Sequence, residues 1–555
     1  MLLKALLRLI PFALIAGALA LTGLPATGAP KERPSGTAPR VLNHMSQSVQ
    51  LRYYLSHPEQ APETVRALQE AAEADPAQAS PAAPGGLSAD VFNDDDIGFP
   101  QNEESVSACG RQPRFVLEGT NDYRGLIDPV GNFTGYHFST DGGRTLAKEG
   151  LLPALRAGGE TLPSGGDPVV QTDDNCNFYM SSLNYGLDPA GPGNNGIGLY
   201  RTSLRRLRNC PAGEDPEDLT QPSCWPTRRL VATAASPGGV GQFLDKEWFD
   251  VGRSGSAGNV VWVAFSDFAV DVNEPLGFTG AQIKAVRCSA DLTNCTQPIL
   301  ISGTDEDVQF SDVTITESGR TLITWAQIEG ELEETAQTFT VKARIAPAGS
   351  TTFGPTRIVS RETNPIPFGG FMHANDWRVA TYPKSIAPKV NGRERLFVLW
   401  DRCRFRLLDS TCEESEIVMS QSTNDGRDWS QPKTISTGGD NYFPAVSDEV
   451  GNRRFVVGWF TNRFDRIFHN RQDVEVVTVN GGTGNVVKRQ RVTKVSNESE
   501  ADPLLGGFFI GDYIDVHLIK GRVYVGYNAN YRSIRVLGQG FPIPQQDNYV
   551  SVVAP

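Results

Sequence analysis

The chain of 555 residues carries 51 Lys and Arg against 64 Asp and Glu, which gives a formal net charge of −13. This acidic balance argues against a nucleic-acid partner, which needs a basic face, and it repels anionic membranes and polyanionic substrates unless a local basic pocket overrides it. The 56 Gly and 37 Pro, with few long helical patterns, favour an all-β, turn-rich protein.

The N-terminus has the pattern of an export signal. Lys4 and Arg8 precede an apolar run from Leu9 to Leu24, and the small residues of 27–29 offer a cleavage site. An uncleaved anchor is the alternative, but the run is short for a membrane span. We therefore expect residues 1–29 to be a signal peptide, and the mature protein to be secreted (periplasmic or extracellular) without a membrane span.

Residues 30–95 are rich in Ala, Pro, Glu and Gln. Apolar residues between Pro62 and Glu73 share one face of a short helical pattern, but prolines flank it. This composition is typical of a linker or prosegment, and a largely disordered tether is the simpler interpretation.

From residue 96 onward one pattern returns seven times. Each copy has a short apolar segment, a turn with Gly or Asn, and an alternating strand, at intervals of roughly 60 to 80 residues. The copies are Glu104 to Asp122, Asp167 to Asn184, Trp248 to Asp267, Phe310 to Gln327, Ser385 to Asp401, Ala445 to Asn462 and Tyr513 to Asn528. Their second strands are expected to begin near Phe115, Phe178, Val261, Leu322, Leu396, Phe455 and Val523. Because one such unit cannot bury both faces alone, the units must stack radially and close on themselves, which predicts a β-propeller over residues 96–555.

A tight turn recurs in the second hairpin of the first, third and fifth units. It runs from Ser139 to Leu146, in a degenerate form from Ser289 to Cys295, and from Ser422 to Trp429. An Asp or Asn side chain bonds N–H groups further on, a Gly supplies positive φ, and a large apolar residue anchors the hairpin. The residues that define the two full copies are Ser139, Asp141, Gly143, Ser422, Asn424, Gly426 and Trp429.

The pattern Ser-x-Asp/Asn-x-Gly-x-Thr/Asp-Trp resembles the Asp-box, or BNR repeat, of the sialidase-like β-propellers. Further stretches resemble bacterial secreted BNR-repeat proteins: Asn102 to Val106, Asn121 to Arg124, Asp245 to Trp248 and Gly511 to Tyr513. The resemblance implies four-stranded antiparallel blades with the boxes at the periphery, away from any active site. The seven units favour seven blades, and the six blades of the sialidases are the alternative.

The eight cysteines fit an oxidising compartment. Three pairs are close in sequence and bracket turn-like segments, which leaves a fourth pair by elimination, and other connectivities stay open. The pairs are Cys210 with Cys224, Cys288 with Cys295, Cys403 with Cys412, and Cys109 with Cys176. No Cys-x-x-Cys spacing or His-rich cluster indicates a metal site. We expect no cofactor, and a structural calcium ion stays open.

The resemblance implies that three arginines would hold the carboxylate of a substrate at one mouth of the propeller. Four arginines lie at expected strand ends and are the substrate-binding candidates: Arg124, Arg463, Arg402 and Arg532. Pairing with a neighbouring Asp is the alternative for each. The Phe/Tyr-Arg-Ile-Pro motif that supplies the first arginine in sialidases is absent, since Arg114 follows Gln112-Pro113.

The resemblance also implies a tyrosine nucleophile beside a carboxylate, and a separate carboxylate as acid/base. Tyr513 follows Asp512 where the seventh unit begins, and Asp245 and Glu247 lie just before the third unit, so these four are the catalytic candidates. Packing of Tyr513 and backbone bonding by Asp245 are the alternatives, because adjacent residues of a strand point to opposite faces.

These features indicate a secreted carbohydrate-active propeller that acts on an extracellular glycan or glycoconjugate. If it is an enzyme, glycoside hydrolysis of the exo-sialidase type is expected. A non-catalytic glycan- or protein-binding (adhesion) propeller is the first alternative, and a polysaccharide lyase is the second. We expect a monomer.

Overall fold

The computed structural model describes residues 50, 54, 60–61, 66, 99–186, 194–210, 220–234, 240–271, 278–329, 338–362, 370–372, 375, 377–406, 412–505, 509–534 and 543–555. The chain divides into Met1–Thr37, of which no residue is described, and Ala38–Pro555, which contains the propeller. The predicted signal peptide lies outside the described residues, as does almost all of the predicted linker. These two boundaries stay predictions. Among the described residues, no helix has the length and apolar character that a membrane crossing needs.

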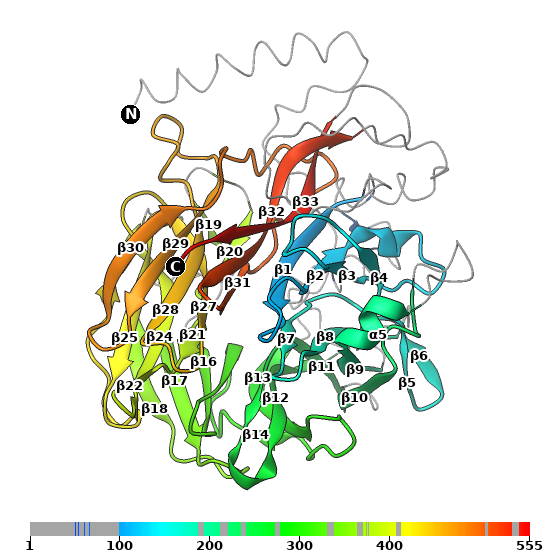
Figure 1. The fold of residues 1–555 in the computed structure, drawn as a ribbon, viewed down its shortest axis with the longest axis horizontal. Coiled ribbons are helices and arrows are strands. Elements are labelled where there is room, and N and C mark those ends of the chain that lie inside the picture. Colours follow the sequence, from blue (N-terminus) through cyan, green and yellow to red (C-terminus); the bar gives the residue numbers. More distant parts are fainter. Residues whose placement is uncertain are drawn as a thin grey trace. The chain divides into compact units, whose positions relative to one another are not determined.

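The described chain forms seven antiparallel blades, six with four strands and the last with three (Figure 1). Blade 1 consists of β1 (Gln101–Ala108), β2 (Val116–Asp122), β3 (Thr134–Ser139) and β4 (Lys148–Leu151). Blade 2 consists of β7 (Val170–Thr172), β8 (Asn177–Tyr185), β9 (Asn195–Ser203) and β10 (Thr227–Ala234). Blade 3 consists of β11 (Val240–Arg253), β12 (Asn259–Asp271), β13 (Phe278–Ser289) and β14 (Ile299–Leu300). Blade 4 consists of β15 (Val308–Ile315), β16 (Thr321–Glu329), β17 (Thr338–Ala346) and β18 (Arg357–Glu362). Blade 5 consists of β21 (Lys384–Ile386), β24 (Leu396–Arg406), β25 (Cys412–Ser422) and β26 (Lys433–Thr434). Blade 6 consists of β27 (Asn441–Asp448), β28 (Arg454–Thr461), β29 (Asp473–Asn480) and β30 (Asn485–Arg491). Blade 7 consists of β31 (Asp515–Ile519), β32 (Arg522–Ile534) and β33 (Ile543–Val553).

Short elements lie between these strands. They are the hairpins β5 (Leu155–Ala157) with β6 (Glu160–Leu162), β19 (Gly370–Phe371) with β20 (Arg378–Val379), and β22 (Lys389–Val390) with β23 (Arg393–Glu394), and the helix α5 (Leu204–Asn209). The 3-10 helices are Tyr123–Leu126 and Gly255–Ala257.

The seven repeats of the sequence are the seven blades, so the prediction of a seven-bladed propeller is confirmed and the six-bladed alternative is wrong. Each expected second strand begins within two residues of the observed β2, β8, β12, β16, β24, β28 or β32. The repeat is visible in the sequence because the second strand of each blade carries buried apolar residues in its first few positions.

The inner strands of neighbouring blades contact one another around the whole ring, and in Figure 1 the last blade lies beside the first. Side chains of one inner strand bond the backbone of the next. Asp250 accepts the amide of Ile315 at 2.6 Å, and Asp312 accepts the amide of Ser385 at 2.8 Å. Such bonds satisfy backbone groups that would otherwise be buried without partners, and they fix the blades in register.

Blade 7 closes on blade 1 through the same kind of bond. Asp515 of β31 accepts the hydroxyl of Ser105 at 2.7 Å and the amide of Val106 at 3.1 Å. Asn548 of β33 donates to Glu118 of β2 at 2.6 Å. We call this contact the seam. No strand is exchanged across it among the described residues, because β31, β32 and β33 pair only with each other.

Tryptophans fill the spaces between blades. Four of them occupy similar positions on second strands and are fully buried: Trp262, Trp325, Trp400 and Trp459. Replacing one such large side chain by Ala removes about 3–5 kcal/mol of stability in other proteins. The packing between blades therefore rests on a repeated aromatic position in the second strands.

All four disulfides of the sequence prediction are present. Cys109–Cys176 joins the first hairpin of blade 1 to that of blade 2, whereas the other three close short loops within blades 2, 3 and 5. Four disulfides are typical of an oxidising, extracytoplasmic environment.

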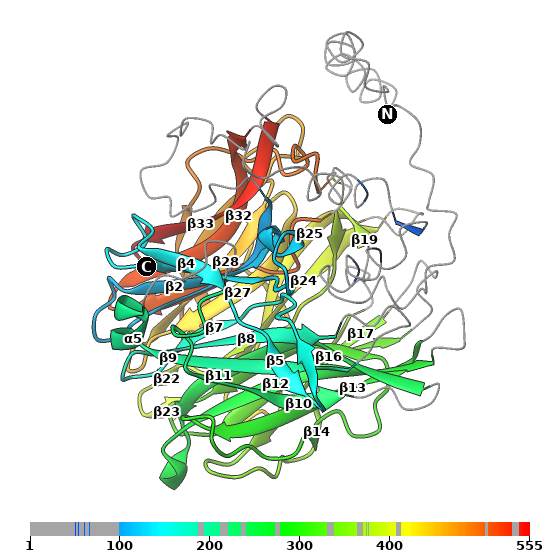
Figure 2. The ribbon, with the colours of Figure 1, turned by 90° about the vertical axis from the view of Figure 1, so that its right-hand side faces the viewer.

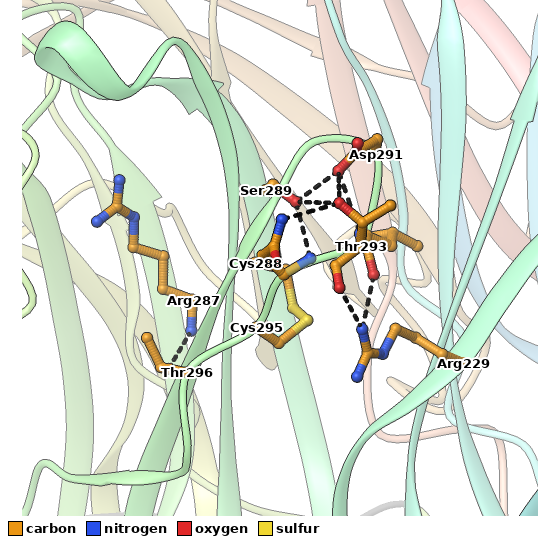
Figure 3. Close-up of a disulfide and its surroundings, with 10 residues drawn as sticks. Arg229, Arg287, Cys288, Ser289, Asp291, Thr293, Cys295 and Thr296 are labelled. Atoms are coloured by element: carbon orange, nitrogen blue, oxygen red, sulfur yellow. Dashed lines mark hydrogen bonds between the residues drawn. A yellow bond between two sulfur atoms is a disulfide. The ribbon is translucent and has the colours of Figure 1, made fainter.

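The three boxes lie where the sequence placed them, between β3 and β4, β13 and β14, and β25 and β26. Asp141 accepts the amides of Arg144 and Thr145 at 3.1 and 3.0 Å, and Gly143 has a φ of 83°. In the degenerate copy of Figure 3, Asp291 accepts the amide of Thr293 at 3.1 Å and the Cys288–Cys295 disulfide closes the same loop. In both turns an Asp side chain accepts backbone amides two to four residues further on.

The boxes lie at one end of the strands, and inner strands begin at the other end. The pairing of Gln101 with Asp122 and of Asn441 with Thr461 shows that inner strands start where second strands end. We call this end the mouth. In Figure 2 the mouth-side strand β19 lies on the right, whereas α5 and the β22–β23 hairpin, which belong to the opposite end, lie on the left.

Candidate functional site

The inner strands begin with a repeated backbone irregularity at the mouth. β1, β11, β15 and β27 each have a bulge whose first residue has a positive φ: Glu103 at 59°, Lys246 at 54°, Phe310 at 58° and Phe443 at 55°. Asp167, just before β7, has a φ of 54°. Non-glycine residues rarely adopt this conformation, and such bulges re-aim a side chain.

Contacts among these residues show where the bulges aim them. Phe310 lies with its ring centroid 4.2 Å from that of Tyr382, which lies 5.8 Å from that of Phe443. Lys246 lies 6.0 Å from the Phe310 ring centroid. These residues come from blades 3 to 6, so they meet near the propeller axis. We call this set, with Glu103, Asp167, Arg378 and Asp512, the central cluster.

Asp512 is the ionised carboxylate of the central cluster. Lys246 donates to its Oδ2 at 2.9 Å, and Arg378 forms a two-point contact with both oxygens, with Nε 2.8 Å from Oδ1. Burial alone would raise the pKa of Asp512, but Arg378 and then Lys246 outweigh it and lower this pKa to about 2. The carboxylate is therefore fixed in orientation and charged at any physiological pH.

Glu103 is a second carboxyl group of the central cluster, and its pKa is shifted in the opposite direction to that of Asp512. Its Oε1 accepts the backbone amide of Asp512 at 3.0 Å, so the two residues are neighbours across the seam. Burial, and then the negative charge of Asp512, raise the pKa of Glu103 to about 7. Burial and the charge of Glu103 also raise the pKa of Asp167. The cluster thus holds one charged carboxylate, that of Asp512, beside two carboxyl groups, those of Glu103 and Asp167, whose pKa values are raised.

The structure places Tyr513 beside the cluster but aims its hydroxyl elsewhere. The hydroxyl donates to the carbonyl oxygen of Pro168 at 2.8 Å, and the ring packs edge-on against Trp248 with centroids 5.5 Å apart. Burial raises the pKa of Tyr513 well above its usual value. Among its described contacts no carboxylate receives the hydroxyl proton, so the pairing with Asp512 that the sequence suggested is not observed.

Asp245 and Glu247 flank Lys246 in the bulge of β11. Asp245 accepts the amide of Lys246 at 2.9 Å, which is the backbone-bonding alternative for this residue. Glu247 is buried, and burial followed by the charge of Asp245 raises its pKa. The residue of this segment that contacts Asp512 is therefore the lysine between them.

Three of the predicted substrate-binding arginines bind carboxylates of their own blades. Arg124 contacts Asp122 and Glu149, with Nη1 2.9 Å from the latter. Arg463 pairs with Glu475, and Arg402 pairs with Glu416 at 2.9 Å. Arg532 lies on β32 at a bulge, half-buried. The ends of β2, β24 and β28 do lie at the mouth, but convergence of these side chains on one anion stays a prediction.

The arginine that the structure brings to Asp512 is Arg378, which the sequence did not single out. It lies on β20, in an insertion between blades 4 and 5 that crosses to other blades. In this insertion Asn375 donates to the carbonyl oxygen of Asn470 in blade 6 at 3.0 Å, and Arg378 also lies over the ring of Phe509 at 4.9 Å. An insertion has no counterpart in the repeat, so the periodicity gave no signal for it.

Glu103, Asp167 and Lys246 had a weaker signal. Glu103 lies one residue before the first expected unit, Asp167 is the first residue of the second, and Lys246 lies two residues before the third. Charged residues therefore recur at or just before the start of these three units. Within the described residues, no group of three or more His, Cys, Asp and Glu is arranged to hold a metal ion.

No family model and no curated protein matches the chain. Solved structures do resemble it. "Hadza microbial sialidase Hz136" is 10% identical, with 76% of this chain and 74% of that chain covered and a TM-score of 0.39. "Phage phi92 endosialidase" is 11% identical over 82% and 67%, with a TM-score of 0.40. "Crystal structure of polysaccharide lyase Uly1" is 10% identical over 85% and 94%, with a TM-score of 0.39. The likeness is one of fold.

Proposed function

We propose that the protein is a secreted glycoside hydrolase that acts on an extracellular glycan at the mouth of the propeller. The observation that carries this proposal is the pair of neighbouring carboxyl groups of Glu103 and Asp512 near the axis, held in opposite protonation states by their surroundings. Glycosidases usually cleave the glycosidic bond with two carboxyl groups whose pKa values differ.

Each group has one role in this proposal. Glu103, with a pKa of about 7, donates a proton to the oxygen of the leaving sugar. Asp512, with a pKa of about 2, stays ionised and stabilises positive charge that develops at the sugar ring. Water adds to the anomeric carbon as the bond to the leaving sugar breaks, and the Glu103 carboxylate takes up the proton that this water loses. Lys246 and Arg378 hold Asp512 in place, and Arg378 does so from the β19–β20 insertion. The exo-sialidase type of reaction, with Tyr513 as nucleophile, is less favoured because the Tyr513 hydroxyl is bound to a carbonyl oxygen.

Glu103→Gln tests the proposal. We expect it to lower kcat at least about 100-fold against a hydrolysed glycoside, because it removes the transferable proton and keeps the shape. The measurement is hydrolysis of a panel of fluorogenic glycosides, with sialosides included, by the purified chain. Asp250→Asn is the matched control, because Asp250 is a half-buried carboxyl with a pKa of about 7 that accepts the backbone amides of Val251 in its own strand and of Ile315 in blade 4, away from the central cluster.

Two outcomes would contradict the proposal. Equal activity of Glu103→Gln and the parent protein would remove Glu103 as the acid. An unsaturated, ultraviolet-absorbing product from uronate polymers would instead identify a lyase.

A non-catalytic binding propeller is the second candidate, and one observation favours it. Glu103, Lys246 and Asp512 are 0%, 8% and 4% exposed, and both Glu103 and Lys246 bond Asp512, which also suits a structural cluster. Such a protein would retain glycans on an array and cleave none of the glycosides.

A further inference from the structure

One mouth loop displays large apolar side chains to solvent. It joins β28 to β29 in blade 6, and in it Ile467 is 78% exposed and Phe468 is 58% exposed. Arg466 beside them is exposed and has no ion-pair partner within the described residues. We call Arg466, Ile467 and Phe468 the blade-6 tip. Exposed apolar side chains grouped in this way are typical of a binding surface.

The loop that carries the tip is tightly bonded at its base. Asp465 accepts the amides of Phe468 and Asn470 at 3.4 Å and of Arg471 at 3.3 Å. The side chain of Asn462 donates to the carbonyl oxygen of His469 at 2.5 Å. These bonds hold the tip outward in a fixed conformation, so binding there would cost little ordering entropy.

The blade that carries the tip is basic, although the chain as a whole has a net charge of −13. Residues 441–497 contain nine Lys and Arg against five Asp and Glu. Arg463 and Arg491 both lie over the ring of Phe464, with Cζ 4.1 and 4.9 Å from its centroid. Arg463 and Arg491 are themselves paired with Glu475 and Asp473, so the positive charge that blade 6 offers to an anionic ligand at the mouth is that of Arg466.

The tip is also linked to the central cluster. Asn470, two residues beyond the tip, accepts a hydrogen bond from Asn375 of the insertion whose Arg378 binds Asp512. A chain molecule that lies across the tip is therefore next to the insertion that supplies Arg378 to Asp512.

We propose that the blade-6 tip is an accessory subsite for an anionic polysaccharide, and this inference rests on the proposed function. A sugar ring packs on the exposed face of Phe468, and a carboxylate or sulfate group of the polymer pairs with Arg466. The subsite holds a long substrate at the rim while the central cluster acts on it, so it contributes to the binding of polymers and not to the hydrolysis of small glycosides.

The test is affinity of the full chain for polygalacturonate, dextran sulfate and neutral dextran at two salt concentrations. We expect binding to an anionic polymer and about tenfold weaker binding for Phe468→Ala. Arg466→Gln should weaken binding by a similar factor and reduce its dependence on salt, because it removes the charge. Val450→Ala is the matched control, since Val450 is 79% exposed at the opposite end of the same blade and should leave affinity unchanged.

The two anionic polymers separate carboxylate from sulfate recognition. Equal affinity for neutral dextran would overturn the anionic class, and unchanged affinity in both tip variants would overturn the subsite. A change in oligomeric state in the tip variants would show that the tip mediates association with a second copy of the chain. That result would also overturn the subsite. Hydrolysis of small glycosides reports on the central cluster alone, so a parent protein that binds polymers but cleaves nothing refutes the proposed hydrolase and leaves the subsite standing.

Discussion

Glu103 and Asp401 are fully buried and Asp250 and Asp448 are half-buried, and the pKa of each of these four carboxyl groups lies near 7, chiefly because burial disfavours the charged form. In the unfolded chain such groups titrate near pH 4. The folded state therefore binds their protons more tightly, and each group destabilises the fold progressively as pH rises from about 4 to about 7. Asp512 acts in the opposite direction, because its lowered pKa favours the fold above pH 4 and this contribution is lost as pH falls toward 2.

The first prediction at this scale concerns pH. We expect the free energy of unfolding to be higher at pH 5 than at pH 8, measured by urea denaturation at both values. Asp250→Asn should shrink the difference, because an amide stays neutral at both pH values while it keeps one of the two backbone bonds that Asp250 accepts. Stability that rises between pH 5 and pH 8 would show that these carboxyl groups are ionised in the fold.

At the scale of elements, the inner strands are joined by side chains that accept backbone amides of the next strand. Asp515 makes such a bond across the seam and binds Ser105 as well. We expect Asp515→Ala to lower the free energy of unfolding by about 2–4 kcal/mol, because it leaves buried donors without partners. Ser447→Ala is the comparison, since Ser447 accepts one amide, that of Leu518 at 3.0 Å, and should cost about 1 kcal/mol. A smaller loss for Asp515→Ala than for Ser447→Ala would contradict the importance of the seam.

Some of these elements can be predicted from the sequence, and the central cluster cannot. The second strands were predictable because their apolar runs are local and repeated, and the box turns were predictable because Asp141 and Asn424 bond groups within five residues. The central cluster was not, because Glu103 and Asp512 are 409 residues apart and meet only after the ring closes. The sequence points to Asp512 through its neighbour Tyr513, whereas its partners Lys246 and Arg378 come from blade 3 and from an insertion.

At the scale of the whole molecule, one disulfide differs from the other three in what it joins. Cys109–Cys176 closes 67 residues and links two blades, whereas Cys288–Cys295 closes 7 residues within one turn. A longer closed loop restricts the unfolded chain more. Replacing Cys109 and Cys176 by Ser should therefore cost about 4 kcal/mol, against about 2 kcal/mol for Cys288 and Cys295, measured by thermal or urea unfolding. The reverse order would indicate that the short loop matters through its box turn.

Every blade, finally, is made from one contiguous stretch of chain, and at the seam neighbouring blades meet through side chains without sharing a strand. A blade can therefore be duplicated, deleted or exchanged by cutting the gene between two sheets, without dividing any sheet. Each such change would alter the mouth, because every blade, or the segment just before it, places one residue of the central cluster near the axis. New ligand specificity in this architecture is thus open to recombination of whole blades as well as to point substitution.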